Sequence, residues 1–335
     1  MKTGALIVAA GNETDSEAFR PMLPVGDSTA IRRIIITMKQ AGIDPVVVVT
    51  GKRGDELEKH IAKLRVICLR NEEYGHTQMF DSIRMGLHYM EDLCDRVFIL
   101  PAKFPMFLPV TVEKMMEENA PVVCPVLAGR RGHPILVASG LIPKIAAFEG
   151  KFGLRGALDQ PEIREKICEI PVEDEGIILA VDTEADCANP AVEAGRIAVH
   201  PRVHFDLERN EEFFGPFMAQ FLTLIGHTGS MQTACRQMHM SYTKGWSMLR
   251  AAEKQLGFPF LVTRSGGAEG GFSQLTAQSE DFLRRYLAME QALSQAGEQL
   301  FVRYFPEYAG HVRDRDGEED KGHLFENQQR EDDTL

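Results

Sequence analysis

The stretch Leu6-Ile7-Val8-Ala9-Ala10-Gly11, followed by a polar loop and then Arg20-Pro21-Met22-Leu23-Pro24-Val25-Gly26, decides the fold of the first part of the chain. A short apolar run that ends at a glycine is typical of a strand leading into a loop and a helix. The glycine lets the backbone approach an anion, so the amides of Ala9, Ala10 and Gly11 are candidates for binding phosphate. When the segment is taken alone, an ordinary strand-to-helix turn is the more common explanation.

Strand-like and helix-like segments alternate over the first 200 residues, which predicts an α/β fold: a three-layer, mostly parallel, Rossmann-like sheet. The helix-like segments have apolar residues three and four positions apart. The expected strands are Ala5–Ala10, Pro45–Thr50, Val66–Leu69, Val97–Leu100 and Pro121–Val126, and the expected helices are Thr29–Ala41, Asp55–Leu64, Thr77–Met90 and Val110–Glu118.

The composition indicates a globular protein of two domains. The 335 residues are 44% hydrophobic, and no apolar run has the roughly 20 residues of a membrane span, so we expect no membrane partner. Six scattered cysteines without a CxxC pair favour a reducing compartment, and we expect the cytoplasm. The net charge of −12 argues against a protein coated in nucleic acid, although it averages over both domains.

The alternating pattern breaks around residues 201–215, where an acidic stretch precedes Gly215-Pro216. We therefore predict a first domain over 1–205 and a second over 215–300. The second domain is expected to hold helices, with strands only near 260–275. Beyond residue 309 the chain is charged and has few apolar residues, so 309–335 is predicted to be a disordered acidic tail.

The second domain has the pattern of a winged helix-turn-helix. Helices are expected from Phe217, over Met231–Met238 and over Tyr242–Leu256, with Ser230 and Ser241 as N-caps and Gly257 as the stop. Two extended runs, Phe260–Arg264 and Gly271–Thr276, flank a glycine-rich turn that would form the wing.

The first domain resembles the nucleotidyltransferases, and within them the molybdopterin cytidylyl- and guanylyltransferases. The Ala9-Ala10-Gly11 and Arg20-Pro21 segments match the blocks with which that family clasps a triphosphate. Further matches, in the family order, are Asn71, Tyr74, Ser82 and Gly86, the Gly132-His133-Pro134 turn, and Val181-Asp182-Thr183 with Asp186.

The resemblance implies that CTP or GTP is bound and that CMP or GMP is transferred to molybdopterin, with Mg²⁺ neutralising the phosphates. It places the nucleotide at Ala9, Ala10, Gly11, Arg20, Asn71 and Ser82, and the second substrate at Gly132, His133 and Pro134. It makes Arg20, Lys103 and Asp182 the catalytic candidates, with Asp182 as the one candidate metal ligand. For His133, shaping the loop is the more common role of such a turn, and a substrate contact is the alternative.

The sequence departs from this family at three places. Glu13, Asp15 and Glu17 put negative charge into the phosphate loop, and Arg20 replaces a lysine. Where the family has a metal-binding aspartate two residues before a proline, this chain has Lys103. A lysine cannot coordinate Mg²⁺, but its ammonium can pair directly with a phosphate. Lys103 is therefore either a phosphate contact or a solvated loop lysine in a domain that has lost catalysis.

The second domain resembles the winged helices of LysR-type and ModE-type regulators, which implies binding of double-stranded DNA and a homodimer formed through the C-terminal helix, expected over Ala277–Gln295. The segment between residues 230 and 275 contains five basic residues and only two acidic ones, which gives it a positive net charge. A solvated helix face is the alternative for Arg250. The DNA-contacting candidates are Ser230, Ser241, Tyr242, Thr243, Lys244, Arg250 and Arg264.

Three hypotheses for the whole chain stay open, of which the last in rank is that the first domain only assembles oligomers or binds a partner protein. In the first, the protein transfers a nucleotide to molybdopterin and its DNA-binding domain regulates transcription. In the second, it is a catalytically inactive regulator of molybdenum metabolism that senses a nucleotide or a cofactor. The order of the motifs favours the first hypothesis, while Lys103 and the acidic phosphate loop favour the second.

Overall fold

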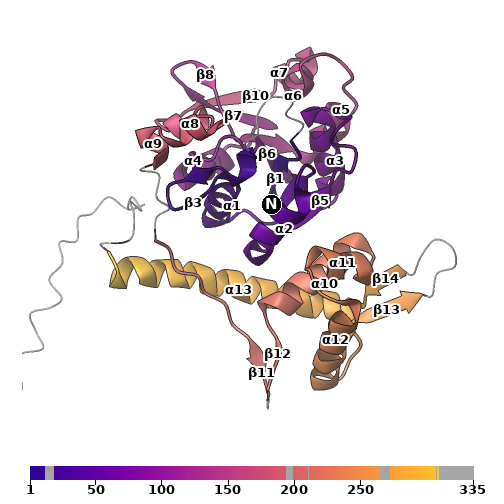
Figure 1. Cartoon of the computed structure of the whole chain (residues 1–335). Helices are drawn as coiled ribbons and strands as arrows, with labels where there is room; N and C mark the ends of the chain where they lie inside the picture. Colours follow the sequence, from indigo (N-terminus) through magenta and orange to yellow (C-terminus); the bar gives the residue numbers. More distant parts are fainter. Residues whose placement is uncertain (12–18, 194–198, 210, 265–271, 307, 309–335) are drawn as a thin grey trace, which may run out of the picture. The chain divides into compact units, whose positions relative to one another are not determined.

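The computed structural model describes residues 1–11, 19–193, 199–209, 211–264, 272–306 and 308 (Figure 1). The chain divides into two compact units. The first comprises Met1–Ile197 and His204–Met289, and the second comprises Ala198–Val203 and Glu290–Leu335. The acidic residues predicted to lie in the phosphate loop, Glu13, Asp15 and Glu17, fall outside the described residues, as do residues 309–335.

The N-terminal part of the first unit is built on an eight-stranded sheet in the order β10-β7-β9-β6-β1-β4-β5, with β8 paired to β7. β1 pairs in parallel with β4 and β6, β4 with β5, and β7 with β10, whereas β9 is antiparallel to both β6 and β7. The mostly parallel sheet predicted from the sequence is thus confirmed. The strands are β1 Thr3–Ala9, β4 Val46–Thr50, β5 Ile67–Arg70, β6 Arg96–Pro101, β7 Val122–Leu127, β8 Arg130–Arg131, β9 Ile135–Ala138 and β10 Ile167–Pro171.

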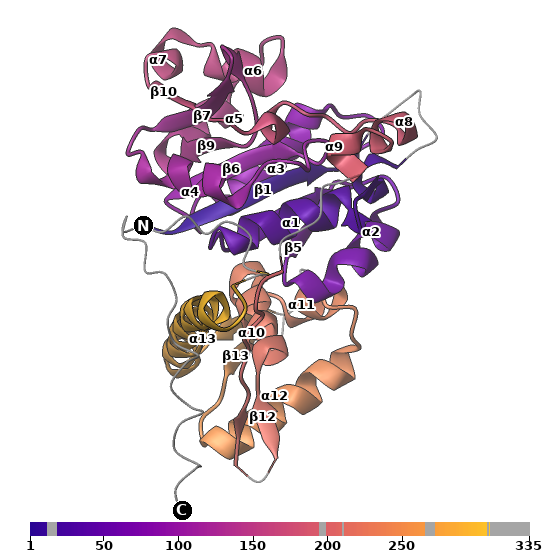
Figure 2. The same cartoon turned by 90° about the vertical axis from the view of Figure 1, so that its left-hand side faces the viewer.

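Helices cover both faces of this sheet, as Figures 1 and 2 show. One face packs against α1, α2 and α4, and the other against α3, α5 and α6. The alternation of side chains along β1 explains this: Ala5 and Ile7 face the first set of helices, and Leu6 and Val8 face the second. The helices are α1 Ala30–Gln40, α2 Gly54–Ile61, α3 Met79–Met90, α4 Pro109–Glu117, α5 Ile142–Ala146, α6 Gly153–Leu158 and α7 Pro161–Arg164.

Smaller elements complete the N-terminal part. The Arg20-Pro21-Met22 segment forms the 3-10 helix η1 and leads into the short pair β2 Pro24–Val25 and β3 Ser28–Thr29. Two short helices, α8 Glu184–Cys187 and α9 Pro190–Glu193, follow the Asp182 segment. Every strand and helix predicted for the first 120 residues is present, with ends that shift by one or two residues or, for the end of α2, by a 3-10 turn.

The region around residues 201–215, where the sequence places the domain boundary, holds a pair of strands that was not predicted, whereas the strands after it lie near 260–275 as expected. β11 Leu207–Glu208 and β12 Glu212–Phe214 form a short antiparallel pair there. Phe214 is fully buried and makes edge-to-face contacts with Phe260 and Phe282. The acidic residues concealed this pair because only Leu207, Phe213 and Phe214 supply an apolar signal, which is too short for a strand pattern.

Three helices and a hairpin follow: α10 Pro216–Thr228, α11 Met231–Gln237, α12 Tyr242–Leu256, and the antiparallel pair β13 Leu261–Arg264 and β14 Phe272–Leu275. The predicted caps are present. The Ser230 hydroxyl accepts from Thr233 N, and the Ser241 hydroxyl accepts from Lys244 N. Gly257 ends α12 with φ +80°, a conformation that favours glycine. Residues 265–271, the predicted wing, lie outside the described residues.

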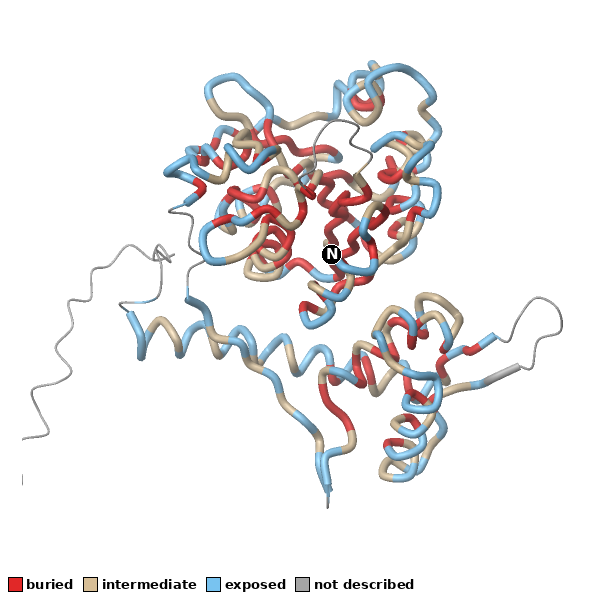
Figure 3. The backbone as a smooth tube through the Cα atoms, in the orientation of Figure 1, coloured by how far each residue is buried: buried red, intermediate tan, exposed pale blue. Residues whose placement is uncertain are grey.

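Helix α13 spans Ala277–Tyr304 and runs nine residues further than predicted. It continues from the first unit into the second, where a Cβ on Gly297 would lie 2.4 Å from Val203, so the extended segment 199–203 runs directly against the helix. Figure 3 shows the burial contrast: the central sheet is buried, while most of α13 is exposed.

Candidate functional site

The candidate site lies at the carboxyl edge of the parallel strands. Because β1, β4, β5 and β6 run in the same direction, the residues that follow them share one edge of the sheet. Gly11 follows β1, Asn71 follows β5, and Lys103 follows β6. Open α/β sheets bind their ligands at this edge. The fold therefore brings these three predicted site residues to the same side of the domain.

Gly11 has the conformation that a phosphate-binding turn needs. Its φ is +50°, and a Cβ built on it meets nothing within 4 Å, so glycine is required by its backbone conformation and not by crowding. Ala9 and Ala10 are buried at the end of β1, and Ala10 O accepts a hydrogen bond of 2.9 Å from Lys52 N. Lys52 was not predicted as a site residue, although the Gly51-Lys52 pair at the end of β4 is a comparable signal.

Backbone hydrogen bonds of Lys103 and of its neighbour Ala102 hold the Lys103 segment in place. Ala102 N donates to Val8 O at 2.9 Å, and Lys103 O accepts from Val181 N at 2.8 Å. The segment beyond is also held, because buried Arg33 donates through Nε to Pro105 O at 2.9 Å. The Lys103 ammonium lies 5.3 Å from the centre of the Phe104 ring, within the range of a cation–π contact.

Asp182 meets both predicted cationic residues. Its Oδ2 lies 3.7 Å from Lys103 Nζ, and its Oδ1 lies 3.0 Å from Arg20 Nε. Arg20 Nε directs its hydrogen bond to the main-chain oxygen of Asp182, at 3.2 Å. Oδ1 is buried and accepts no aligned hydrogen bond from the residues that the structure describes. The three catalytic candidates thus form one cluster, in which the carboxylate pairs with cations of its own chain.

The backbone around Asp182 is held independently of its carboxylate. Asp186 Oδ2 accepts hydrogen bonds from Asp182 N at 2.9 Å and from Thr183 N at 2.8 Å. Thr183 and Asp186 form the capping box of α8. The hydrogen bonds from Asp182 N, Thr183 N and the Thr183 hydroxyl lower the pKa of Asp186. The Asp182 side chain is therefore not needed to keep its segment in place.

The Gly132-His133-Pro134 turn packs against the segment that leads to Asp182. His133 N donates to Ile177 O at 2.8 Å, and a Cβ on Gly132 would lie 2.6 Å from Ile177, so only glycine fits there. Pro134 is buried and follows through a cis peptide bond. These contacts hold the turn against the segment around Ile177.

The imidazole of His133 stacks on Phe104, with 4.5 Å between ring centres. Burial, with a smaller contribution from Lys103, lowers the pKa of His133 to about 4. Its Nδ1 is buried and has no hydrogen-bond partner within the described part of the chain. Phe104, which links His133 to Lys103, was not predicted as a site residue. Its signal was its place directly after Lys103.

Asn71 and Ser82, both predicted to bind the nucleotide, are buried and bind each other. Asn71 Nδ2 donates to Ser82 Oγ and to Thr77 Oγ1, each at 3.0 Å, and Asn71 Oδ1 accepts from Glu73 N. This network ties the loop after β5 to α3. Asn71 and Ser82 thus engage each other, whereas Arg20, Lys103 and Asp182 form the charged cluster of the site.

The candidate DNA-contacting residues lie mainly along one exposed stretch of α12. Ser241, Tyr242, Thr243, Lys244 and Arg250 are all exposed. The Arg250 guanidinium lies 5.6 Å from the centre of the partly buried Trp246 ring. Ser230 begins α11, where its hydroxyl is engaged in capping. Arg264 ends β13, and its side chain lies outside what the structure describes.

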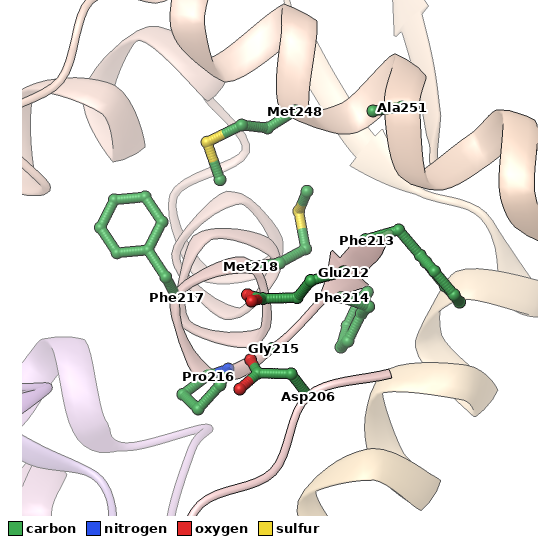
Figure 4. A pocket seen from close by; sticks show the side chains of 10 residues that line it. All are labelled: Asp206, Glu212, Phe213, Phe214, Gly215, Pro216, Phe217, Met218, Met248 and Ala251. Atoms are coloured by element: carbon green, nitrogen blue, oxygen red, sulfur yellow. The ribbon is translucent and has the colours of Figure 1, made fainter. Parts of the chain in front are cut away.

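A cavity of about 270 Å³ lies between β12, the start of α10 and α12 (Figure 4). Its walls combine Phe213, Phe217, Met218 and Met248 with two carboxylates, Asp206 and Glu212. None of the predicted nucleotide-binding residues lines it.

The described residues contain no group of three or more His, Cys, Asp or Glu side chains that could hold a metal ion. Asp182, the one predicted metal ligand, faces Lys103 and Arg20. The residues present therefore do not fit a magnesium site. Among the helices that the structure describes, none has the length and apolar character to cross a membrane.

Comparison with known proteins finds similarities that cover mainly the N-terminal part of the chain. Residues 5–165 match the MobA-like NTP transferase domain. Molybdenum-pterin-binding protein MopB of Rhodobacter capsulatus is 33% identical over 84 residues, which are 25% of this chain and 31% of MopB. The bifunctional protein GlmU of Staphylococcus saprophyticus is 21% identical over 138 residues, 40% of this chain and 30% of GlmU. The chain thus spans about a third of each of these two relatives.

Similar solved structures include a nucleotidyl transferase from Methanothermobacter thermautotroptrophicus, with a TM-score of 0.49, 17% identity, and coverage of 55% of this chain and 94% of that one. Another is the 4-diphosphocytidyl-2C-methyl-D-erythritol synthase of Anaerococcus prevotii, with a TM-score of 0.47, 15% identity, and coverage of 58% and 97%. Residues 5–165 of this chain are thus similar to the MobA-like NTP transferase domain.

Proposed function

We propose that this protein is a DNA-binding regulator whose MobA-like domain binds a nucleotide as a signal without transferring it. The observation that carries the proposal is the Lys103–Asp182 ion pair of 3.7 Å beside Arg20. Phosphoryl and nucleotidyl transfer need divalent cations to neutralise the developing charge. Here a lysine stands at the end of β6 and occupies the carboxylate that would otherwise hold such a cation.

Nucleotide binding is supported by the family match and by the geometry of the sheet edge. Gly11, with its positive φ, follows the first strand of the MobA-like domain, and Lys103 and Arg20 provide positive charge at the same edge. CTP and GTP are the proposed ligands because the motifs resemble those of molybdopterin cytidylyl- and guanylyltransferases. The similarity to the molybdenum-pterin-binding protein MopB supports molybdopterin as a further ligand.

The proposed DNA-binding part is a winged helix formed by α10, α11, α12 and the β13–β14 hairpin. In this proposal α12 enters the major groove, with Tyr242, Thr243 and Lys244 near its exposed N-terminal end. Arg250 supplies a phosphate contact further along the same helix. The excess of basic residues between 230 and 275 supports DNA binding by this part of an otherwise acidic chain. Such a role places the protein in the cytoplasm.

A homodimer through α13 suits this proposal, because a two-fold dimer reads a two-fold DNA site. Large apolar side chains are exposed along the helix, at Leu287, Met289, Leu300 and Tyr304. Positions 289, 293, 300 and 304 are spaced as on one face of a helix. A second copy of the chain would cover this face.

The second candidate function is transfer of CMP or GMP to molybdopterin. The family match over residues 5–165 favours it, since relatives of this class transfer nucleotides. It requires the Lys103 ammonium to stabilise the phosphates in place of a metal ion. Release of pyrophosphate from CTP or GTP, with Mg²⁺ and molybdopterin present, tests it directly on the unaltered protein and on Lys103→Asp.

The experiment that tests the regulator function measures DNA affinity of the full chain with and without nucleotide. Duplexes enriched from a random pool by binding to the protein serve as the probe. We expect CTP or GTP to change their affinity at least about fivefold, which corresponds to a coupling free energy of about 1 kcal/mol. Lys244→Ala should weaken binding and lower the salt dependence by about one counterion. Lys63→Ala, in the N-terminal domain, is the matched control and should change neither.

The outcomes separate the two candidates. Pyrophosphate release by the unaltered protein would overturn the sensor function and establish a transferase. An unaltered protein that releases none, combined with nucleotide-dependent DNA affinity, supports the regulator. A DNA affinity that does not change when CTP, GTP or molybdopterin is added would contradict the regulator function.

A further inference from the structure

The proposed nucleotide site contains an ion cluster whose carboxylate competes with any anionic ligand. Lys103 and Arg20 both pair with Asp182, through Oδ2 at 3.7 Å and Oδ1 at 3.0 Å. About a third of each of the Lys103 and Asp182 side chains is exposed, so solvent and ligands reach the pair. A phosphate group presents the same feature as this carboxylate, oxygen atoms that carry negative charge and accept hydrogen bonds from cations.

From this arrangement we propose that Asp182 is a displaceable counter-ion, and that the site binds a phosphate oxyanion through Lys103 and Arg20 without a divalent cation. This inference rests on the proposed nucleotide-binding function and names how that binding works. The bound phosphate takes the place of the Asp182 carboxylate, which turns away toward solvent. No covalent bond forms or breaks.

The cation side of the site is preorganised for this exchange. The Lys103 backbone is held on both sides, by the Ala102 N to Val8 O bond and by the Val181 N to Lys103 O bond. Phe104 lies beneath its ammonium and is itself stacked on His133. A cation fixed in this way loses little conformational entropy when it binds an anion, which favours tight binding.

The carboxylate side is arranged so that it can leave. Asp182 N is held by Asp186 Oδ2 at 2.9 Å, and Val181 N by Lys103 O at 2.8 Å, so the main chain stays in place when the side chain turns. Asp182 Oδ1 is buried and accepts no aligned hydrogen bond from any described residue, so this oxygen is held by the charge of Arg20 and not by a hydrogen bond. Its departure therefore costs less than that of a fully hydrogen-bonded carboxylate.

The test is calorimetric titration of the full chain with CTP, GTP and inorganic pyrophosphate, each in excess EDTA and again with Mg²⁺. We expect binding in EDTA that Mg²⁺ does not strengthen. Asp182→Asn removes the competing charge at nearly constant volume and should tighten binding in EDTA by about fivefold, the effect of a partly exposed ion pair. Lys103→Met should weaken it about tenfold or more. The matched control Asp92→Asn removes an exposed carboxylate between α3 and β6, at the other edge of the sheet, and should change neither.

The direction of the Asp182→Asn effect decides the inference. A metal ligand or a structural carboxylate predicts weaker binding after this substitution, and such a result would overturn the proposal, as would binding that requires Mg²⁺. If Asp182→Asn does not fold, judged by circular dichroism, full binding by Lys103→Met in EDTA overturns the proposal and loss of binding supports it. A gain with CTP or GTP identifies a nucleotide as the ligand, whereas a gain with pyrophosphate alone identifies a free polyphosphate.

Failure of this inference differs from failure of the proposed function. If CTP changes the DNA affinity only when Mg²⁺ is present, the regulator function is supported and the counter-ion mechanism is refuted. If CTP binds without metal but does not change the DNA affinity, the counter-ion mechanism is supported and the regulator function is refuted.

Discussion

At the scale of single residues, the candidate site consists of charged side chains that pair with one another and of two aromatic rings that stack. Lys103 and Arg20 both pair with Asp182, and the Lys103 ammonium lies over the Phe104 ring. His133 stacks on Phe104, and its burial makes the neutral imidazole the stable form. The site therefore presents fixed positive charge beside a neutral histidine near pH 7.

The lowered pKa of His133 makes stability depend on pH. Its pKa is about 4 in the folded protein and about 6.5 in an unfolded chain, so between these values the unfolded chain binds a proton that the folded one does not. The contribution of His133 to the free energy of unfolding is fully present above pH 6.5 and is lost as the pH decreases toward 4. Going from pH 7 to pH 5 should cost about 2 kcal/mol through this residue alone.

Urea unfolding of the unaltered protein and of His133→Gln at pH 7 and pH 5 measures this contribution. The loss of stability on acidification should be about 2 kcal/mol smaller in His133→Gln. His227, whose pKa burial also lowers, is present in both proteins and cancels in the comparison. Equal losses in the two proteins would contradict a buried, neutral His133.

At the scale of elements, the ends of α12 depend on two residues that the sequence already identified. Ser241 caps the N-terminus by accepting from Lys244 N at 3.2 Å, and Gly257 closes the C-terminus at φ +80°. Ser241→Ala should lower the free energy of unfolding by about 1 kcal/mol, since it leaves a backbone N–H of the first turn unsatisfied.

Ser247→Ala is the control for that substitution. Ser247 is exposed in the middle of α12, where alanine favours the helix, so thermal or urea unfolding should show no loss of stability. Equal destabilisation by the two substitutions would mean that the hydroxyl of Ser241 does not cap the helix. Ser241→Asp, which keeps an accepting oxygen, should retain most of the stability.

At the scale of the whole molecule, the exposed apolar side chains of α13 predict self-association. Leu300→Glu should convert a dimer to a monomer, because two-fold symmetry places the new charge in the interface twice. We expect the dimer dissociation constant to rise about tenfold or more, measured by light scattering during size-exclusion chromatography. Gln299→Glu adds the same charge one position away and should leave the mass unchanged. A monomeric unaltered protein would refute the dimer.

The sequence of this protein determined the local structure and the order of the motifs. Strands with continuous apolar runs, helices with apolar residues at three- and four-residue spacing, and caps such as Ser230 and Ser241 are encoded within short windows. The same windows failed for β11 and β12, whose pairing is supported by Phe214 packing on residues far along the chain. They also ended α13 nine residues too early, before the stretch that contains Gly297.

Only the tertiary structure decided what the site residues do. The sequence named Arg20, Lys103 and Asp182, but they are separated by about 80 residues or more, and only the folded chain brings their charges within 4 Å. The tertiary structure likewise showed that Asn71 donates a hydrogen bond to Ser82, and that Phe104 contacts both the Lys103 ammonium and the His133 ring. The physical reason is that local structure depends on near neighbours, whereas the pairing of charges and rings depends on which chain segments the packed sheet and its helices place side by side.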